Sequence, residues 1–196
     1  TSSQRAKEFG KKYSVNFHNS FESLLEHEEF DAALVCTPTF THSDITKRLI
    51  ENKKHVFVEK PMTYLSEDGQ NLIDAAKRNN VILTCGYIER FNPAVASVKD
   101  FLKSQKYGDL IRLEFYREHR MPQHIKDVGV IYDTSVHDID TAMWLFDETP
   151  EIVFAIAGKI NHEHEDFATI TLGFKDNKTA TISSNWITPI RVRNFN

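Results

Sequence analysis

Short apolar runs alternate with amphipathic segments along the first 90 residues. The apolar runs cover residues 31–36, 55–58 and 81–84, a length typical of strands. Between them, hydrophobic residues recur at helical spacing, as in residues 43–52. Continuous apolar strands that alternate with helices predict an α/β unit: a parallel sheet with helices on both faces.

Polar residues mark where these helices begin. Ser2 or Ser3 is placed to cap a first helix, and Ser66 to cap the helix before the third strand. Asn19, with Glu22 three residues later, resembles a capping box at the start of a short helix.

The pattern changes after residue 92. Asn92 as N-cap and Pro93 as first helical residue predict a helix that ends at Lys106. Alternating strands then follow at residues 110–116, 152–160, 167–174, 179–186 and 190–196, interrupted by one helix over 133–146. We therefore expect a second, α+β domain over residues 91–196, with an open, mostly antiparallel sheet.

Composition narrows the class of protein. The 196 residues are 40% hydrophobic and 27% charged, which is typical of globular domains, and the net charge of −4 argues against nucleic-acid binding. No apolar run approaches the ~18 residues of a membrane span, and no signal peptide opens the chain. Cys36 and Cys85 lie in apolar runs, so we expect buried, reduced thiols in a cytoplasmic protein.

A lysine follows the second strand, at the edge where parallel sheets bind ligands. Thr37 and Pro38 end the first strand, and Glu59-Lys60-Pro61 ends the second. Lys60 is placed to be a fixed cation over this crevice, and a solvated lysine in a turn is the alternative. His42 opens the next helix and is either a ligand contact or an exposed histidine.

The helix over 133–146 carries the strongest candidate. Asp133, His137, Asp140 and Trp144 fall on one stripe, while the apolar residues form another, so packing does not require the histidine. A carboxylate one turn away orients the imidazole and favours its charged form, which makes an acid/base pair. An exposed charged face is one alternative. A metal site of Asp133, His137 and Asp140, as in a metal-dependent hydrolase, is another.

Two histidine-containing loops are weaker candidates. A basic loop before this helix suits an anionic substrate, and its residues are Arg117, His119, Arg120 and His124. The tract over residues 162–166 has metal-ligand residue types, but its position between two strands favours a solvated turn.

Five motifs occur in a specific order: Thr37-Pro38 with His42, Glu59-Lys60-Pro61, residues 86–93 (GYIERFNP), Gly129 through Asp133-x-x-x-His137-Asp-Ile-Asp140, and Trp144-Leu145. Together they resemble the glucose–fructose oxidoreductase / inositol dehydrogenase (Gfo/Idh/MocA) family of NAD(P)-dependent oxidoreductases. The resemblance implies a partial Rossmann domain over residues 1–90 and a substrate and oligomerisation domain over 91–196, with a homo-oligomer formed through its sheet. Family members begin with a glycine turn that this chain lacks. We therefore expect a piece of a longer protein that is inactive by itself.

The resemblance also assigns roles. It implies hydride transfer between NAD or NADP and a hydroxyl of a sugar, nucleotide-sugar or polyol, with Lys60 as active-site lysine, His137 as acid/base and Asp133 as its partner. The implied cofactor-binding residues are Cys36, Thr37, Pro38, His42, Glu59 and Lys60. The implied substrate contacts are Arg117, Tyr87 and Trp186.

Two further features of the resemblance concern the substrate. Tyr132, Thr134 and Ser135 depart from the small or aliphatic residues common in the family, so we expect them to reshape the sugar pocket. Residues 184–193 look most like members that act on UDP-N-acetylglucosamine-type sugars. The alternative function is a non-catalytic regulatory protein that senses dinucleotide on the same fold.

Overall fold

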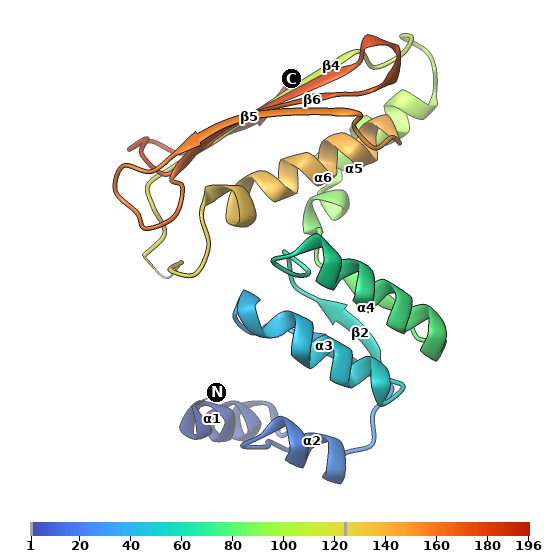
Figure 1. The fold of residues 1–196 in the computed structure, drawn as a ribbon, viewed down its shortest axis with the longest axis vertical. Coiled ribbons are helices and arrows are strands. Elements are labelled where there is room, and N and C mark those ends of the chain that lie inside the picture. Colours follow the sequence, from blue (N-terminus) through green and yellow to red (C-terminus); the bar gives the residue numbers. More distant parts are fainter. Residues whose placement is uncertain (1, 124) are drawn as a thin grey trace.

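The three apolar runs of the first part form a parallel sheet, as predicted (Figure 1). The strands are β1 (Ala32–Val35), β2 (His55–Val58) and β3 (Leu83–Cys85), paired in that order. The structure is a computed structural model that describes residues 2–123 and 125–196. The bounds of β2 match the predicted ones, because an apolar run that ends before a proline leaves little freedom in where the strand stops.

Four helices accompany this sheet: α1 (Ser3–Tyr13), α2 (Phe21–His27), α3 (His42–Glu51) and α4 (Ser66–Asn79), with the 3-10 turn η1 (Thr39–Thr41) before α3. We expected helices on both faces, but α3 and α4 pack together on one face of the described sheet. With strand order β1-β2-β3, two right-handed crossovers place both connecting helices on the same side. The opposite face carries Leu34, which is 74% exposed.

Two predicted helix caps are shifted by one residue. Ser2 caps α1 as expected, but Ser20 rather than Asn19 caps α2, accepting from the Ser23 N–H at 3.1 Å. Leu65 occupies the N-cap position of α4, and Ser66 is its first helical residue. Adjacent polar residues have similar capping preferences, so packing decides which one starts the helix.

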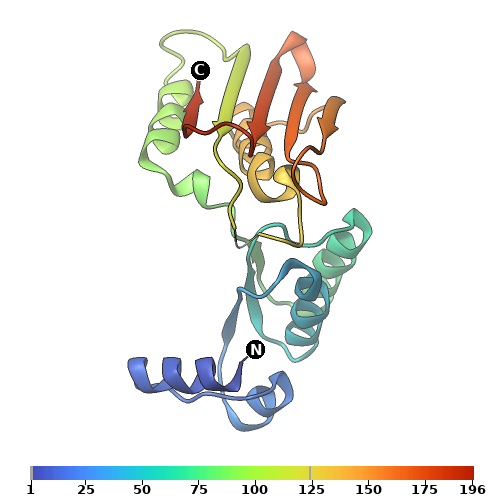
Figure 2. The same cartoon turned by 90° about the vertical axis from the view of Figure 1, so that its left-hand side faces the viewer.

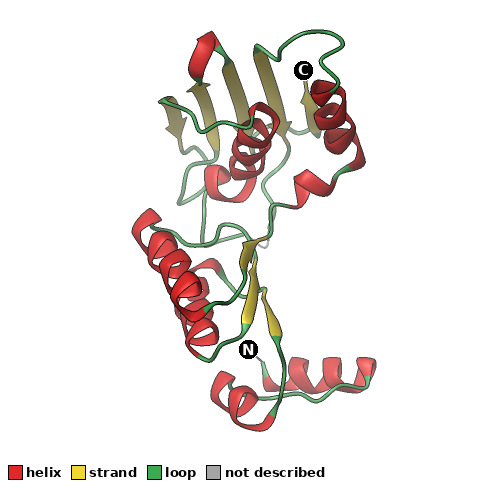
Figure 3. Cartoon of the chain, turned by 90° about the vertical axis from the view of Figure 1, so that its right-hand side faces the viewer, coloured by secondary structure: helices red, strands yellow, loops and turns green. Residues whose placement is uncertain are grey.

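The second part is a five-stranded sheet with two helices on one face (Figures 2 and 3). Its elements are η2 (Ile88–Phe91), α5 (Pro93–Lys103), β4 (Arg112–Glu118), η3 (Ile131–Ser135), α6 (Val136–Phe146), β5 (Ile152–Gly158), β6 (Phe167–Gly173), η4 (Lys175–Asn177), β7 (Thr179–Asn185) and β8 (Val192–Phe195). The strand order is β5-β6-β7-β4-β8, and only the β4–β7 pair is parallel. The mostly antiparallel sheet is confirmed. Asn92 caps α5 as predicted, although the helix ends at Lys103 instead of Lys106.

The helix that carries the candidate acid/base pair starts earlier than predicted. A π-helical turn, η3, precedes α6 and contains Asp133. Glu165 supports this turn, since its Oε1 accepts the Ile131 N–H at 3.2 Å. A Cβ at Gly129 would meet the Glu165 carboxylate, the end of a flexible side chain, which would have to move from its place beside the Ile131 N–H.

Both cysteines have free thiols, but the expectation that they are buried is wrong. Cys36 is exposed and Cys85 is half-buried. Cys85 is the last residue of β3, and Cys36 directly follows β1, so both lie at the edge of the sheet where the strands end.

Among residues 2–123 and 125–196, no helix is both long enough and apolar enough to cross a bilayer.

Candidate active site

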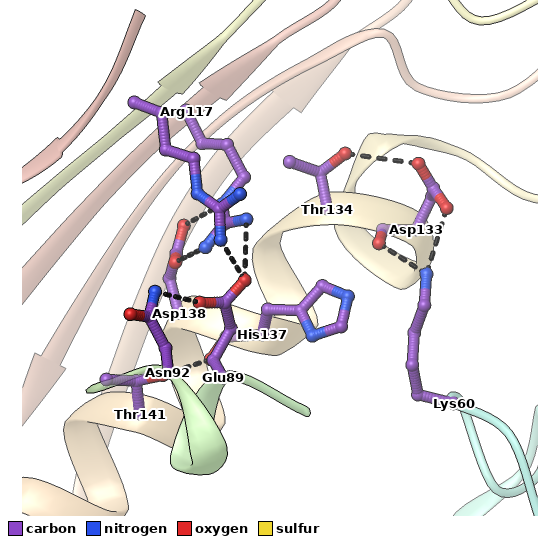
Figure 4. Close-up of polar contacts among 10 residues, drawn as sticks. Lys60, Glu89, Asn92, Arg117, Asp133, Thr134, His137, Asp138 and Thr141 are labelled. Atoms are coloured by element: carbon purple, nitrogen blue, oxygen red, sulfur yellow. Dashed lines mark hydrogen bonds and ion pairs between the residues drawn. The ribbon is translucent and has the colours of Figure 1, made fainter. Parts of the chain in front are cut away.

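Lys60 reaches from the loop after β2 to Asp133 in η3, and so links the first part of the chain to the second (Figure 4). Its Nζ donates to the backbone oxygen of Asp133 at 2.6 Å and to Oδ1 of the same residue at 2.9 Å. The Lys60 and Asp133 side chains are both largely buried. An ammonium group has three donors, so one remains for a ligand.

Lys60, Asp133 and His137 line one cavity of about 180 Å³, so the lysine and the first two residues of the helical stripe face a common cleft. Thr134 and Val192 also line this cavity. Its remaining lining is basic and consists of Arg117, His119, Arg191 and Arg193.

His137 does not form the predicted acid/base pair with Asp133. Its Nδ1 is buried and has no hydrogen-bond partner in the described part of the chain, and Asp133 is hydrogen-bonded to Lys60 instead. Burial, followed by the positive charges of Lys60 and Arg117, lowers the pKa of His137 to about 4. The expected stabilisation of the charged ring is therefore wrong. The ring is neutral near pH 7, which is the form that accepts a proton.

Asp140 does not join this cluster. Its carboxylate accepts two hydrogen bonds from Arg90, at 2.8 and 2.5 Å. Asp133 and Asp140 therefore pair with two different cations and His137 with neither, and the described residues contain no group of three His, Cys, Asp or Glu side chains that could hold a metal ion. In the 162–166 tract, Asp166 instead accepts from the Ile160 and Asn161 N–H groups and shapes the turn.

The predicted cofactor residues share a second cavity, of about 250 Å³, at the carboxyl ends of β1 and β2. All six line it: Cys36, Thr37, Pro38, His42, Glu59 and Lys60. Lys60 and Asp133 belong to both cavities, so the two are adjacent. The position at the edge of a parallel sheet fits a nicotinamide ring.

The ring of His42 is a wall of this cavity and not an exposed contact. It is 1% exposed, and its two nitrogens face the backbone oxygens of Thr37 and Pro61, each at 2.8 Å. His42 thus ties together the loops that follow β1 and β2.

Behind His137 lies a group of charged side chains, largely buried except for the exposed Arg193, that we call the buried network: Glu89, Arg117, Asp138 and Arg193. Arg117 donates to both oxygens of Asp138, at 3.0 and 2.5 Å, and to Glu89 at 3.4 Å. Glu89 also accepts from Arg193. Burial by itself would raise the pKa of Glu89, but a hydrogen bond from Asn92 and the two arginines hold it below its usual value.

The network was not predicted from the sequence, although one signal is present. Glu89 and Arg90 stand between aromatic residues in the motif over 86–93, which is unusual for a surface turn. The network fixes α6 through Asp138, the neighbour of His137.

Only one of the three predicted substrate contacts lines the cavity that contains Lys60 and His137. Arg117 lines it, but its guanidinium is held by the buried network. Neither Tyr87 nor Trp186 is among the lining residues. Burial raises the pKa of Tyr87 to about 12, and Trp186 is 4% exposed. His124 of the basic loop lies outside the described residues.

Comparisons with known proteins decide the family. Residues 1–87 match the model described as an oxidoreductase family with an NAD-binding Rossmann fold, and residues 95–195 match the GFO/IDH/MocA C-terminal domain. The chain belongs to the Gfo/Idh/MocA family. This confirms the resemblance inferred from the motifs.

Individual family members are similar at moderate identity. Over 126 residues, 62% of this chain and 37% of the relative, the chain is 36% identical to scyllo-inositol 2-dehydrogenase (NAD(+)) of Bacillus subtilis. It is 27% identical to UDP-N-acetylglucosamine 3-dehydrogenase of Acidithiobacillus ferrooxidans, over 93% of this chain and 56% of that protein. A crystal structure of UDP-N-acetylglucosamine 3-dehydrogenase from Acidithiobacillus ferrooxidans superposes on this chain with a TM-score of 0.88 and 26% sequence identity. The match covers 99% of this chain and 62% of that one. The chain spans about half the length of the curated relatives it matches.

Proposed function

We propose that the protein is an NAD(P)-dependent dehydrogenase that acts on a hydroxyl group of a sugar, nucleotide-sugar or polyol. The observation that carries this proposal is the placement of the Lys60 ammonium and the neutral His137 ring in one cavity, beside the cavity at the carboxyl ends of β1 and β2. The family supports it, since several relatives are sugar or polyol dehydrogenases by name.

Each residue has a defined task in alcohol oxidation. The third N–H of Lys60 binds the substrate oxygen, and its positive charge stabilises the negative charge that develops there. His137 accepts the hydroxyl proton while the carbon loses a hydride and the C=O bond forms. The nicotinamide of NAD or NADP supplies the hydride acceptor when bound. Asp133 holds the Lys60 ammonium in place through two hydrogen bonds.

The basic lining favours a nucleotide-sugar among these substrates. Arg191 is exposed at the cavity and makes no ion pair with the residues that the structure describes. His119 also lines the cavity, with only its Nδ1 bonded, to the backbone oxygen of Arg120. An arginine without an ion pair and an imidazole nitrogen without a hydrogen bond, both at the cavity, are suited to a phosphate-bearing substrate.

The direct test is a substrate screen with the complete gene product. NAD and NADP are each combined with inositols, free sugars and UDP-sugars, and the formation of reduced nicotinamide is followed. Turnover of one substrate class that is lost in Lys60→Ala supports the proposal. Dinucleotide binding without turnover of any of them would instead favour a regulatory sensor.

We also propose two domains, residues 1–90 and 91–196, in a cytoplasmic homo-oligomer that forms through the second sheet. The face of this sheet opposite α6 carries Ile152, Phe154 and Ile156, each at least 60% exposed. Free thiols support a reducing compartment. Phe154→Glu should shift the complete gene product to a smaller species in light scattering. An unchanged mass would exclude this face as the interface.

A further inference from the structure

Two buried polar side chains, Thr134 in the lining of the cavity and Trp186 behind it, have no role in the chemistry proposed above. Thr134 is 3% exposed and Trp186 is 4% exposed. The Trp186 Nε1 lies 3.4 Å from the Thr134 Oγ1, which in turn lies 3.3 Å from the Asp133 Oδ2. The other carboxylate oxygen, Oδ1, accepts from Lys60. A continuous line of hydrogen bonds thus runs from the core of the second sheet to the lysine, and Figure 4 shows its part from Thr134 to Lys60.

The direction of every hydrogen bond in this line is determined by chemistry. An indole N–H only donates and a carboxylate only accepts. The Thr134 hydroxyl must therefore accept from Trp186, and its single proton is directed to Asp133. Each carboxylate oxygen of Asp133 then has a donor, and the two donors come from different parts of the fold.

Trp186, at the far end of the line, is held firmly. It belongs to the hydrophobic core of the second sheet, and its backbone N–H donates to the backbone oxygen of Asp166 at 2.8 Å. The ring of His162 packs edge-on against its indole at 5.4 Å. Asp166 is 1% exposed and accepts hydrogen bonds from the preceding turn at residues 160–161, so the anchor has little freedom to move.

We propose that Thr134 and Trp186 are positioning residues that keep the Asp133 carboxylate turned toward the Lys60 ammonium. Without the Thr134 hydroxyl, one carboxylate oxygen loses its donor and the carboxylate can rotate away from Lys60. The expected fall in turnover rests on the proposed function, whereas the expected rise in the reactivity of the Lys60 amine does not.

The test compares variants that remove or keep single hydrogen bonds in the complete gene product. Thr134→Val removes the hydroxyl at nearly constant shape, Thr134→Ser keeps it, and Trp186→Phe removes only the indole donor. Thr46→Val is the matched control, because Thr46 is fully buried and its Oγ1 has no partner in the described structure. The readout is the acetylation rate of Lys60 at fixed pH, measured by peptide mass spectrometry.

We expect Thr134→Val to raise the acetylation rate about two- to tenfold, the range that the loss of one hydrogen bond produces. Thr134→Ser should restore the wild-type rate, Trp186→Phe should have a smaller effect, and Thr46→Val should have none. The kcat of Thr134→Val should fall by a similar factor, with an unchanged KM for the cofactor.

Thermal unfolding gives a second signature. Thr134→Val leaves the indole N–H buried without an acceptor, so its midpoint should fall by about 2–8 °C. Adding Trp186→Phe to this variant removes the unsatisfied donor and should recover part of the loss. Additive losses in the double variant would contradict a shared line of hydrogen bonds.

The outcomes separate the two proposals. An unchanged Lys60 acetylation rate in Thr134→Val overturns the positioning role, whatever the activity. If Thr134→Val does not fold, an unchanged rate in Trp186→Phe has the same meaning. A wild-type protein without dehydrogenase activity, in which Lys60 labelling still responds as expected, overturns the proposed function and supports the positioning role.

Discussion

Two charged clusters flank the ring of His137, and they are built in opposite ways. The proposed catalytic cluster of Lys60, Asp133 and His137 keeps unused capacity: a third lysine N–H, and a His137 ring that lines the cavity without a hydrogen bond to the described residues. In the buried network, all four charged groups are paired within the protein. Unused donors and acceptors at a cavity are available to a substrate. Charges that are already paired, although Arg117 and Arg193 also line the cavity, fix the helix that carries the histidine.

The two clusters should therefore respond to mutation in different observables. Changes in the catalytic cluster should lower turnover with small effects on folding. Changes in the buried network should lower stability first, because they leave charges without partners in a buried place.

The largest expected effect is on turnover in His137→Ala. The hydroxyl proton then has no positioned acceptor, so kcat should fall by roughly 10²–10⁴-fold, while dinucleotide binding stays near normal. Steady-state kinetics and calorimetry on the complete gene product measure both quantities. Near wild-type turnover would exclude His137 as the base and would direct attention to Lys60.

The second prediction concerns the stability of the buried network. Arg117→Met leaves the buried Asp138 carboxylate without its main partner, and this should lower the free energy of unfolding by about 3–5 kcal/mol. Chemical denaturation measures the change. Lys103→Met, which removes an exposed pair with Asp100, serves as control and should leave the midpoint unchanged.

A double variant sharpens this test. Replacing the pair together, with Arg117→Met and Asp138→Leu, removes both charges and should recover most of the lost stability. A double variant as unstable as Arg117→Met would show that packing around Arg117 matters more than the unpaired carboxylate.

The difference between the clusters also explains what the sequence could predict. Lys60 and His137 were assigned from short motifs at strand and helix ends, where the local backbone decides the position of the side chain. The salt bridge between Arg193 and Glu89 joins residues 104 apart in the chain. No periodicity or capping rule contains that contact, because it depends on how β8 and η2 pack in three dimensions.

Local errors in the prediction have similar causes. The bounds of β1 and β2 were close because Pro38 and Pro61 follow these strands, whereas the cap of α2 shifted from Asn19 to Ser20. The assumed pairing of Asp133 with His137 followed from helical spacing alone. In the structure, Lys60 arrives from the other sheet and takes that carboxylate.

The third prediction is a pH dependence of stability that comes from His137. The pKa of this residue is about 4 in the folded protein, against 6.5 without perturbation, so between these values the unfolded chain binds the extra proton. Stability should be complete above pH 6.5 and fall as the pH drops toward 4, by roughly 3 kcal/mol from this group. Denaturation of wild type and His137→Gln at several pH values isolates the contribution. Equal slopes in the two proteins would show that the ring is not held neutral.

The smallest expected effect is that of Asp133→Asn on turnover. Lys60 keeps its hydrogen bond to the Asp133 backbone oxygen at 2.6 Å, and an amide oxygen still accepts where Oδ1 does. What is lost is the negative charge beside the ammonium, so kcat should fall only about tenfold, which corresponds to ~1.4 kcal/mol. This is milder than His137→Ala, because the proton acceptor remains. If Asp133→Asn were as severe as His137→Ala, the negative charge of the carboxylate would itself be essential to the reaction, and a role for Asp133 limited to holding Lys60 would be excluded.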